Sequence, residues 1–169
     1  MLLAAVVGLL AGCDAPPSSA PTSVPTGLVV ATDTFGDGET IPPNFTCKAA
    51  GYRPTVSWTP TPAKAFALVV DDPDAPKGDF YHWIVTDLPA GTNKLGATVP
   101  ASAHQAKNSG GTVGWTPPCP PSGTHHYRFT VYALSAPTGV AAGASPEKAV
   151  DAIKAKATEQ GEITGLVSH

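Results

Sequence analysis

The chain carries, at Tyr127–Leu134, the run Tyr-Arg-Phe-Thr-Val-Tyr-Ala-Leu, in which apolar side chains recur at every second position. Successive side chains of a β-strand point to opposite faces of the sheet, so a period of two is typical of a strand with one face in a core. The residues expected on the core face are Tyr127, Phe129, Val131 and Ala133, and those expected on the other face are Arg128, Thr130 and Tyr132. The stretch therefore predicts a β-strand.

Further apolar runs on the N-terminal side of this stretch predict more strands. Phe66–Val70 is apolar throughout, which is consistent with a strand buried on both faces. Shorter runs lie at Leu28–Thr32, Val56–Trp58 and His82–Thr86. Turn-forming residues are frequent between them, since the chain of 169 residues contains 19 Pro and 17 Gly. Short apolar runs separated by turn formers favour one β-rich domain.

The C-terminal part has a helical pattern instead. Ser145–Glu147 supplies a cap residue, a proline for the first helical position and an acid for the first turn. Val150, Ile153 and Ala157 follow at helical spacing, and Gly161 is expected to end the helix. The predicted fold class is therefore mainly β, with one C-terminal helix.

The N-terminal segment is typical of a processing signal. Met1–Gly12 is almost wholly apolar and too short to span a bilayer, as expected for a secretion signal. Leu10–Cys13, which reads Leu-Ala-Gly-Cys, resembles a bacterial lipobox. We therefore expect residues 1–12 to be a lipoprotein signal peptide and Cys13 to carry lipid such as palmitate. No Lys or Arg precedes the apolar run, which leaves open a start codon upstream, an ordinary secretion signal or a cytoplasmic protein.

The composition of the next residues predicts a tether. Residues 14–26 are rich in Pro, Ser and Thr, a composition that cannot bury a core. We therefore expect residues 13–26 to form a lipidated, disordered tether and residues 27–169 to form one folded domain. The expected location is the cell membrane, where a lipid anchor would hold the domain on the extracytoplasmic face without a transmembrane helix.

Two cysteines remain once Cys13 is assigned to the lipid. An even pair usually oxidises outside the cytoplasm, so Cys47 and Cys119 are predicted to form a disulfide, with two free buried thiols as the alternative. Two cysteines this far apart lack a clear third ligand, and no metal is expected. The formal net charge of −3, without a basic block, argues against a nucleic-acid partner.

Three polar clusters could carry chemistry. Asp71–Pro76 puts three carboxylates within four positions directly after an apolar strand, so hydrogen bonds, a cation or solvent must offset their repulsion. Tyr81–Trp83 places a histidine between two aromatics, and Pro117–Tyr127 delivers two histidines from a proline-rich loop to the head of the alternating strand. Because neighbours on a strand face opposite sides, only one of His125 and His126 should line a site. Each cluster also has a structural interpretation, as an acidic turn, a buried histidine or a rigid loop.

These clusters, in this order, resemble the signatures of the phosphatidylethanolamine-binding protein family. Asp72–Pro76 matches the first signature, and His82, followed by Trp-Ile-Val, matches the family's next histidine. Gly123–Tyr127 resembles the second signature, and Pro118–Pro121 before it resembles the bacterial, Raf-kinase-inhibitor-like branch. The resemblance extends over the whole predicted domain. It implies a β-sandwich-like fold with a large central sheet and a small antiparallel sheet.

The resemblance also implies a small pocket for phosphate, acetate or the phosphoryl head group of an ethanolamine lipid. Carried over to this chain, the ligand-binding residues would be Asp72, Pro76, His82, Pro121, His125 and Tyr127. The two histidines can donate hydrogen bonds to an anion, and Asp72 can hold one of them in a single tautomer. The implied function is extracytoplasmic binding of such an anion, with the lipid anchor as the membrane contact and with no catalytic residue and no cofactor.

Departures from the family pattern leave other functions open. His126 stands where the family usually has arginine, so an ion pair there should be weaker, and Trp115–Pro117 replaces a more glycine-rich stretch, which would narrow the mouth. Because some relatives inhibit kinases or proteases by surface contacts, an inhibitor with an unknown protein target is one alternative. A hydrolase or metal site at Asp72, His82 and His125 is another, although no nucleophile elbow or phosphate loop is recognisable.

Overall fold

The computed structural model describes Val24 and Thr26–His169. The predicted signal peptide, the predicted lipidation site Cys13 and most of the predicted tether therefore lie outside the described residues. None of the helices in the described part is long and apolar enough to cross a membrane.

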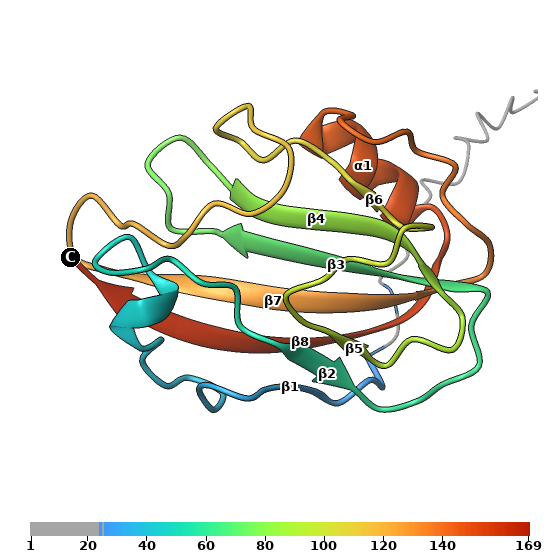
Figure 1. Cartoon of the computed structure of the whole chain (residues 1–169), viewed down its shortest axis with the longest axis horizontal. Helices are drawn as coiled ribbons and strands as arrows, with labels where there is room; N and C mark the ends of the chain where they lie inside the picture. The colour runs from blue at the N-terminus through green and yellow to red at the C-terminus, as the bar shows by residue number, and fades with distance from the viewer. Residues whose placement is uncertain (1–23, 25) are drawn as a thin grey trace, which may run out of the picture.

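A five-stranded antiparallel sheet forms the centre of the molecule (Figure 1). Its strands, in spatial order, are β6 (His104–Gln105), β4 (Phe80–Pro89), β3 (Ala65–Asp72), β7 (Thr124–Leu134) and β8 (Ala157–Ser168). The predicted strands at Phe66–Val70, His82–Thr86 and Tyr127–Leu134 are the middle three. β3 is buried along its whole length because it lies at the centre and both of its faces are covered.

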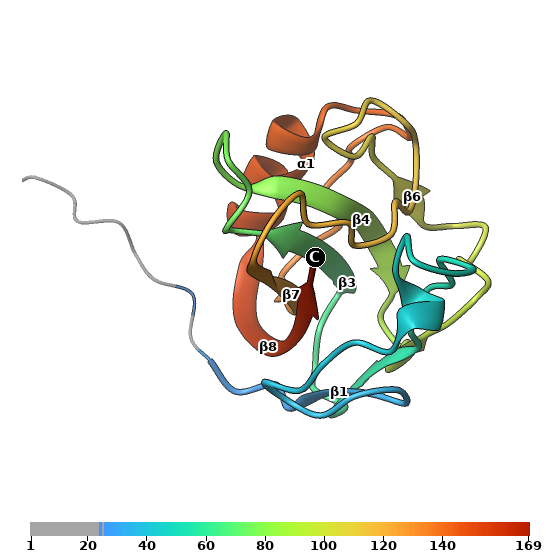
Figure 2. The ribbon, with the colours of Figure 1, turned by 90° about the vertical axis from the view of Figure 1, so that its left-hand side faces the viewer.

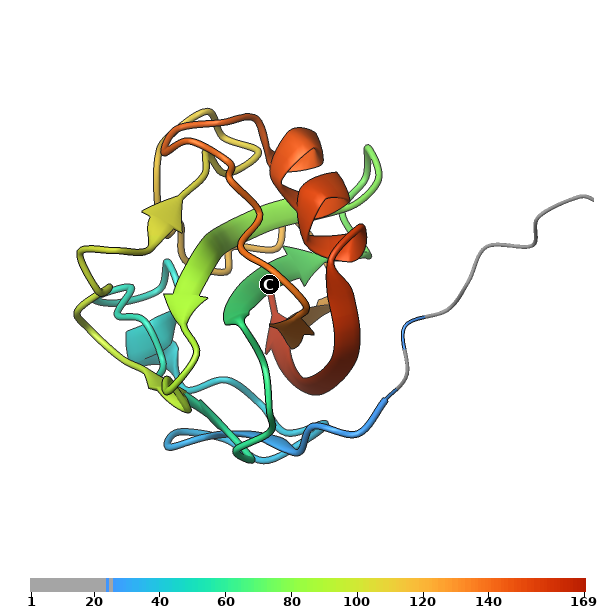
Figure 3. The ribbon, with the colours of Figure 1, turned by 90° about the vertical axis from the view of Figure 1, so that its right-hand side faces the viewer.

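A small three-stranded antiparallel sheet covers one face of the central sheet, and one helix covers part of the other (Figures 2 and 3). The small sheet consists of β1 (Val30–Thr32), β2 (Val56–Trp58) and β5 (Lys94–Leu95), and the helix is α1 (Pro146–Lys154). A short 3-10 turn lies at Pro43–Phe45. The mainly β sandwich with a large sheet, a small sheet and a C-terminal helix is thus confirmed.

Each face of the central sheet has its own hydrophobic core. The larger core lies between the sheets, where Phe66 and Phe129 pack near Trp58 of the small sheet. The smaller core lies under α1, whose Val150 and Ile153 contact the opposite face. The period-two prediction for β7 is confirmed, since its odd-numbered residues from 127 to 133 all belong to the larger core.

The prediction for the end of the helix was wrong. Ser145 caps α1 as expected, but the helix stops at Lys154, and Ala157 and Gly161 belong to the twelve-residue strand β8. Gly161 is no helix terminator. A Cβ atom there would lie 1.9 Å from the carbonyl oxygen of Leu28, so only glycine lets the N-terminal segment cross β8 this closely.

The predicted disulfide between Cys47 and Cys119 is present. The two Cα atoms lie 5.4 Å apart, and 72 positions separate the cysteines in the sequence. The bond joins the segment after the 3-10 turn to the proline-rich loop that precedes β7.

Candidate functional site

A pocket of about 340 Å³ lies at the end of the central sheet where β3 ends and β4 and β7 begin. Its lining includes five of the six residues predicted to bind a ligand: Asp72, Pro76, His82, Pro121 and Tyr127. They meet there because antiparallel pairing brings the end of β3 beside the starts of its two neighbours. Alternation along β3 and β7 turns Asp72 and Tyr127 to the face opposite Asp71 and Arg128, and Pro76 and Pro121 reach the pocket from loops.

His82 enters the pocket from β4 with one ring nitrogen already in use. Its Nδ1 donates to the backbone carbonyl of Thr116 at 2.9 Å, because a carbonyl can only accept. The residue is 5% exposed, and this burial lowers the pKa of His82 below its usual value. The neutral ring therefore leaves Nε2, an acceptor, for a ligand.

The sixth predicted residue, His125, is not part of the pocket lining but contacts Asp72, which is. Its Nδ1 donates to the Oδ2 atom of Asp72 at 2.7 Å, and both side chains are buried. The other carboxylate oxygen, Oδ1 of Asp72, accepts from the backbone N–H of Asp74 at 2.9 Å. These bonds hold the carboxylate of Asp72 in place at the pocket wall. The carboxylate in turn orients the ring of His125, as carboxylates do for histidines at other polar sites.

Tyr127 lines the pocket from β7 and places its hydroxyl beside polar groups of the wall. The residue is fully buried, and its hydroxyl makes no hydrogen bond of good geometry within the described residues, although the carboxylate of Asp72 and the backbone N–H of Cys119 lie near it. Burial, together with the negative charge of Asp72, raises the pKa of Tyr127 far above its usual value. The hydroxyl therefore keeps its proton and can donate it to an anion.

The remaining wall is apolar and stiff. Pro117, Cys119 and Pro121 form one side of the pocket, and the disulfide holds this loop against the small-sheet side of the molecule. Phe80, which sequence reasoning missed, packs against His82 with ring centroids 4.8 Å apart. Its position two residues before His82, and hence on the same face of β4, was the available signal.

Two neighbouring residues lie outside the pocket lining. His126 faces away, as expected, and its Nδ1 lies 2.7 Å from Oδ2 of Asp74, in an exposed histidine–carboxylate contact. Trp115, expected at the mouth, instead packs toward Trp83 and Phe129 and donates to the carbonyl of Gly51 at 2.9 Å. Thr116 and Pro117 take its place at the wall.

No group of three His, Cys, Asp or Glu side chains in residues 24 and 26–169 is arranged to hold a metal ion. At the pocket, His82 Nδ1 and His125 Nδ1 are both committed to protein oxygens. The chemistry that remains is one acceptor nitrogen, one donor hydroxyl and a carboxylate edge, which suits hydrogen bonding to a small polar ligand.

Comparison with known proteins shows which family the chain is similar to. Residues 31–168 match the profile of the family described as phosphatidylethanolamine-binding protein. LppC of Mycobacterium tuberculosis, provisionally named a lipoprotein, is 43% identical over 150 residues, which cover 86% of this chain and 74% of LppC. A UPF0098 protein of Methanothermobacter thermautotrophicus is 36% identical over 143 residues, covering 80% of this chain and 95% of that protein.

Solved structures give the same result. YbcL of E. coli, a member of the same family, superposes with a TM-score of 0.79 at 28% identity, covering 84% of this chain and 98% of that one. The homologue CT736 of Chlamydia trachomatis superposes with a TM-score of 0.77 at 30% identity, covering 85% of this chain and 99% of that one. The chain belongs to the phosphatidylethanolamine-binding protein family.

Proposed function

We propose that the protein binds a phosphate-type anion, such as the head group of a phospholipid, in the pocket between Asp72, His82 and Tyr127, and that it does not transform this ligand. The observation that carries the proposal is the hydroxyl of Tyr127, a fully buried lining residue, which lies near Asp72 and Cys119 but makes no hydrogen bond of good geometry within the described residues. A buried donor without a well-formed hydrogen bond is costly, so a ligand oxygen that accepts from it offsets this cost.

The protonation states on the two sides of the pocket select a particular form of the ligand. Tyr127 donates, whereas neutral His82 accepts through Nε2 because Nδ1 is bonded to Thr116. A phosphate monoester that keeps one P–OH group satisfies both residues at once, since it carries acceptor oxygens and one donor. A fully ionised anion requires His82 to be protonated instead.

The test is calorimetric titration with phosphoethanolamine. Tyr127→Phe removes only the hydroxyl, and we expect it to weaken binding by about tenfold, the effect of losing a hydrogen bond to a charged group. Tyr52→Phe is the matched control, because Tyr52 is 63% exposed and lies outside the pocket lining. Equal affinity in all three proteins would refute the proposal.

We propose that the protein does not convert its ligand chemically, because the pocket offers no activated nucleophile. Cys119, the only thiol position in the lining, is held in the disulfide. Phosphorus NMR of the titrated sample is expected to show intact phosphoethanolamine after prolonged incubation. Release of inorganic phosphate would favour the hydrolase alternative at Asp72, His82 and His125.

We further propose a lipid anchor at Cys13 that holds the domain on the extracytoplasmic face of the cell membrane. The Leu-Ala-Gly-Cys sequence supports this, as does the similarity to LppC, provisionally named a lipoprotein. Metabolic labelling with an alkynyl fatty acid is expected to label the wild-type protein, and Cys13→Ser should abolish both the label and the membrane fraction. Cys13→Ser that retains its label would count against the anchor.

A further inference from the structure

The tautomer of His82 is set by a neighbouring loop rather than by its own strand. Thr116 bonds His82 twice: its backbone N–H donates to the backbone carbonyl of His82 at 3.0 Å, and its own carbonyl accepts from Nδ1 of the ring at 2.9 Å. The second bond fixes the proton on Nδ1, since a neutral histidine ring has two tautomers and the hydrogen bond of one nitrogen decides between them. The position of the Thr116 carbonyl therefore decides what Nε2 offers to a ligand.

Trp115, the residue before this carbonyl, is attached to a distant part of the chain. Its indole Nε1 donates to the carbonyl of Gly51 at 2.9 Å, across 64 positions of the sequence. The ring packs edge-on against Trp83 with centroids 6.1 Å apart, and it lies tilted against Phe129 at 6.5 Å. The indole thus connects the loop before β2 to the central sheet, and a shift of the backbone at Trp115 would break these contacts.

The indole is the side-chain anchor nearest to the Thr116 carbonyl. Within residues 115–118, only Trp115 makes a side-chain hydrogen bond to a described residue. Two of the others are prolines, which also lack a backbone donor. The next anchors along the loop are Asn108, which donates to the carbonyl of Gly114 at 3.1 Å, and the disulfide. Between these two, the indole is the side-chain bond that keeps the Thr116 carbonyl in place.

We propose that Trp115 is a positioning residue that selects the protonation form of the ligand in the anion pocket. By holding the Thr116 carbonyl against Nδ1 of His82, it keeps Nε2 an acceptor. The pocket then favours an anion that brings its own proton, such as a phosphate monoester with one P–OH group, over a fully ionised anion. The inference rests on the proposed anion site and extends it to a residue outside the pocket lining.

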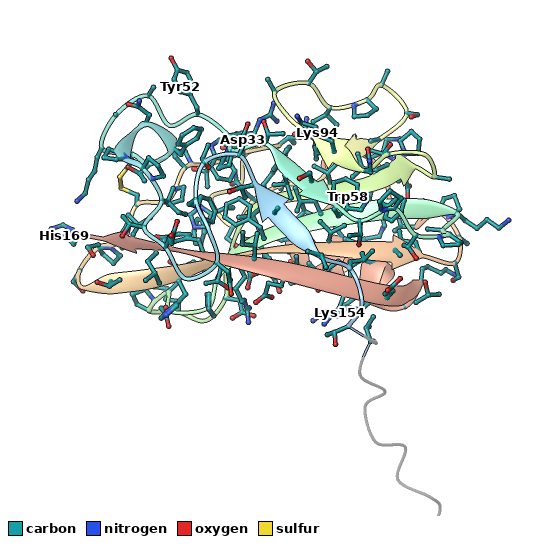
Figure 4. The ribbon with its side chains drawn as sticks, turned by 90° about the horizontal axis from the view of Figure 1, so that it is seen from below. Asp33, Tyr52, Trp58, Lys94, Lys154 and His169 are labelled. Carbon is teal, nitrogen blue, oxygen red and sulfur yellow. A yellow bond between two sulfur atoms is a disulfide. The ribbon has the colours of Figure 1, made fainter. Side chains whose placement is uncertain are left out.

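The first experiment determines the tautomer of His82 in the ligand-free protein. Long-range ¹H–¹⁵N NMR spectra at pH 8 distinguish a protonated ring nitrogen from an unprotonated one, and the wild type should carry its proton on Nδ1. Trp115→Phe removes the bond to Gly51 but keeps an aromatic ring, so it should give a mixture of both tautomers. Trp58→Phe is the matched control and should keep the wild-type tautomer. Trp58 belongs to the same core, its Nε1 has no partner in the described residues, and Figure 4 shows it well apart from Tyr52, the neighbour of Gly51.

A second variant loosens the same bond from its other end. Gly51 has a φ of 67°, and a Cβ atom there would lie 3.1 Å from Pro117, so Gly51→Ala displaces the carbonyl to which Trp115 donates. Gly139→Ala is its control, since Gly139 has a φ of 69° but no atom within 4 Å of the position of its Cβ. Gly51→Ala should give both tautomers of His82, whereas Gly139→Ala should keep the wild-type one.

The second experiment measures the consequence for ligand choice with sulfate, an anion that has no proton to donate. In the wild type, the affinity for sulfate should rise from pH 8 to pH 5 as His82 takes up a proton. In Trp115→Phe this rise should shrink by about threefold, because the Nε2–H tautomer already donates one hydrogen bond at pH 8. A residue that only stabilises the fold would weaken binding equally at both pH values and leave the rise unchanged.

Three results would overturn the inference: a wild-type His82 with its proton on Nε2, a folded Trp115→Phe or Gly51→Ala protein that keeps the wild-type tautomer, or a full rise for sulfate in Trp115→Phe. If Trp115→Phe does not fold, Gly51→Ala decides both measurements. Since the tautomer is determined without ligand, it tests the role of Trp115 separately from the calorimetry of phosphoethanolamine, which tests the anion site.

Discussion

At the scale of single residues, the buried ring of His82 sets the pH dependence of anion binding. Burial lowers the pKa of His82 below 6.5, so in the free protein the ring is neutral at pH 7 and gains its proton only below pH 6.5. An ion with no proton to donate binds better to the protonated ring. The affinity for such an ion should therefore be flat from pH 8 to pH 7 and rise as the pH falls from 6.5 toward 5.

Sulfate is the suitable probe for this prediction, because phosphate monoesters themselves take up a proton near pH 6. Calorimetric titration of sulfate across the range should show the rise in the wild type, whereas His82→Asn should lose it. A matched control is His104→Asn, since His104 bonds the carbonyl of Val140 and lies outside the pocket lining. An affinity for sulfate that is equal at pH 8 and pH 5 would contradict this role of His82.

The residue types of the pocket could be predicted from the sequence, but their hydrogen bonds could not. Motif order identified Asp72, His82 and Tyr127, and the structure brings their side chains to one pocket. The state of His82 depends on the carbonyl of Thr116, which is 34 residues away and belongs to a loop without a periodic pattern. Likewise, the sequence does not show which histidine Asp72 holds, because that depends on the pairing of β3 with β7.

At the scale of elements, the glycines of β8 are sites of close packing. Gly161→Ala would place a Cβ atom 1.9 Å from the carbonyl oxygen of Leu28, which is backbone and cannot rotate away. We expect the free energy of unfolding to fall by about 3 kcal/mol, the upper range for overpacking. Urea denaturation followed by circular dichroism measures this change.

Gly91→Ala is the control for the same chemical change. No atom lies within 4 Å of the position of its Cβ, so its free energy of unfolding should stay within about 0.5 kcal/mol of the wild-type value, as for most surface substitutions. A Gly161→Ala protein as stable as Gly91→Ala would show that the N-terminal segment is not held against β8.

These glycines also explain why the last strand was missed. Three of the five strands of the central sheet were found from apolar runs, whereas β8 carries Gly161 and Gly165 where a strand pattern needs bulky residues. A Cβ atom at Gly165 would lie 2.4 Å from Ile41, so this glycine too is required by a neighbour distant in sequence. Local propensity therefore favoured a longer helix, whereas tertiary packing against distant residues makes this segment a strand.

At the scale of the whole molecule, the chain enters the domain away from the anion pocket. Thr26 pairs with Gln160, whose partner on β7 is Tyr132. Tyr132 and Tyr127 are five residues apart on that strand, about 17 Å at ~3.4 Å per residue. An anchor at Cys13 would thus join the domain at a distance from the pocket, so that the pocket stays open to ligands.

The disulfide affects both the stability of the whole molecule and the shape of the pocket. Cys119 lies in the pocket wall, and its bond to Cys47 closes a loop of 72 residues. Replacing both cysteines by alanine should lower the free energy of unfolding by about 4 kcal/mol on the loop-entropy model. Because the wall loses its covalent attachment, phosphoethanolamine affinity measured by calorimetry on the folded variant should fall as well. Reduction of the wild type should reproduce both effects, and a folded variant that binds phosphoethanolamine as tightly as the oxidised protein would show that the prolines alone hold the wall.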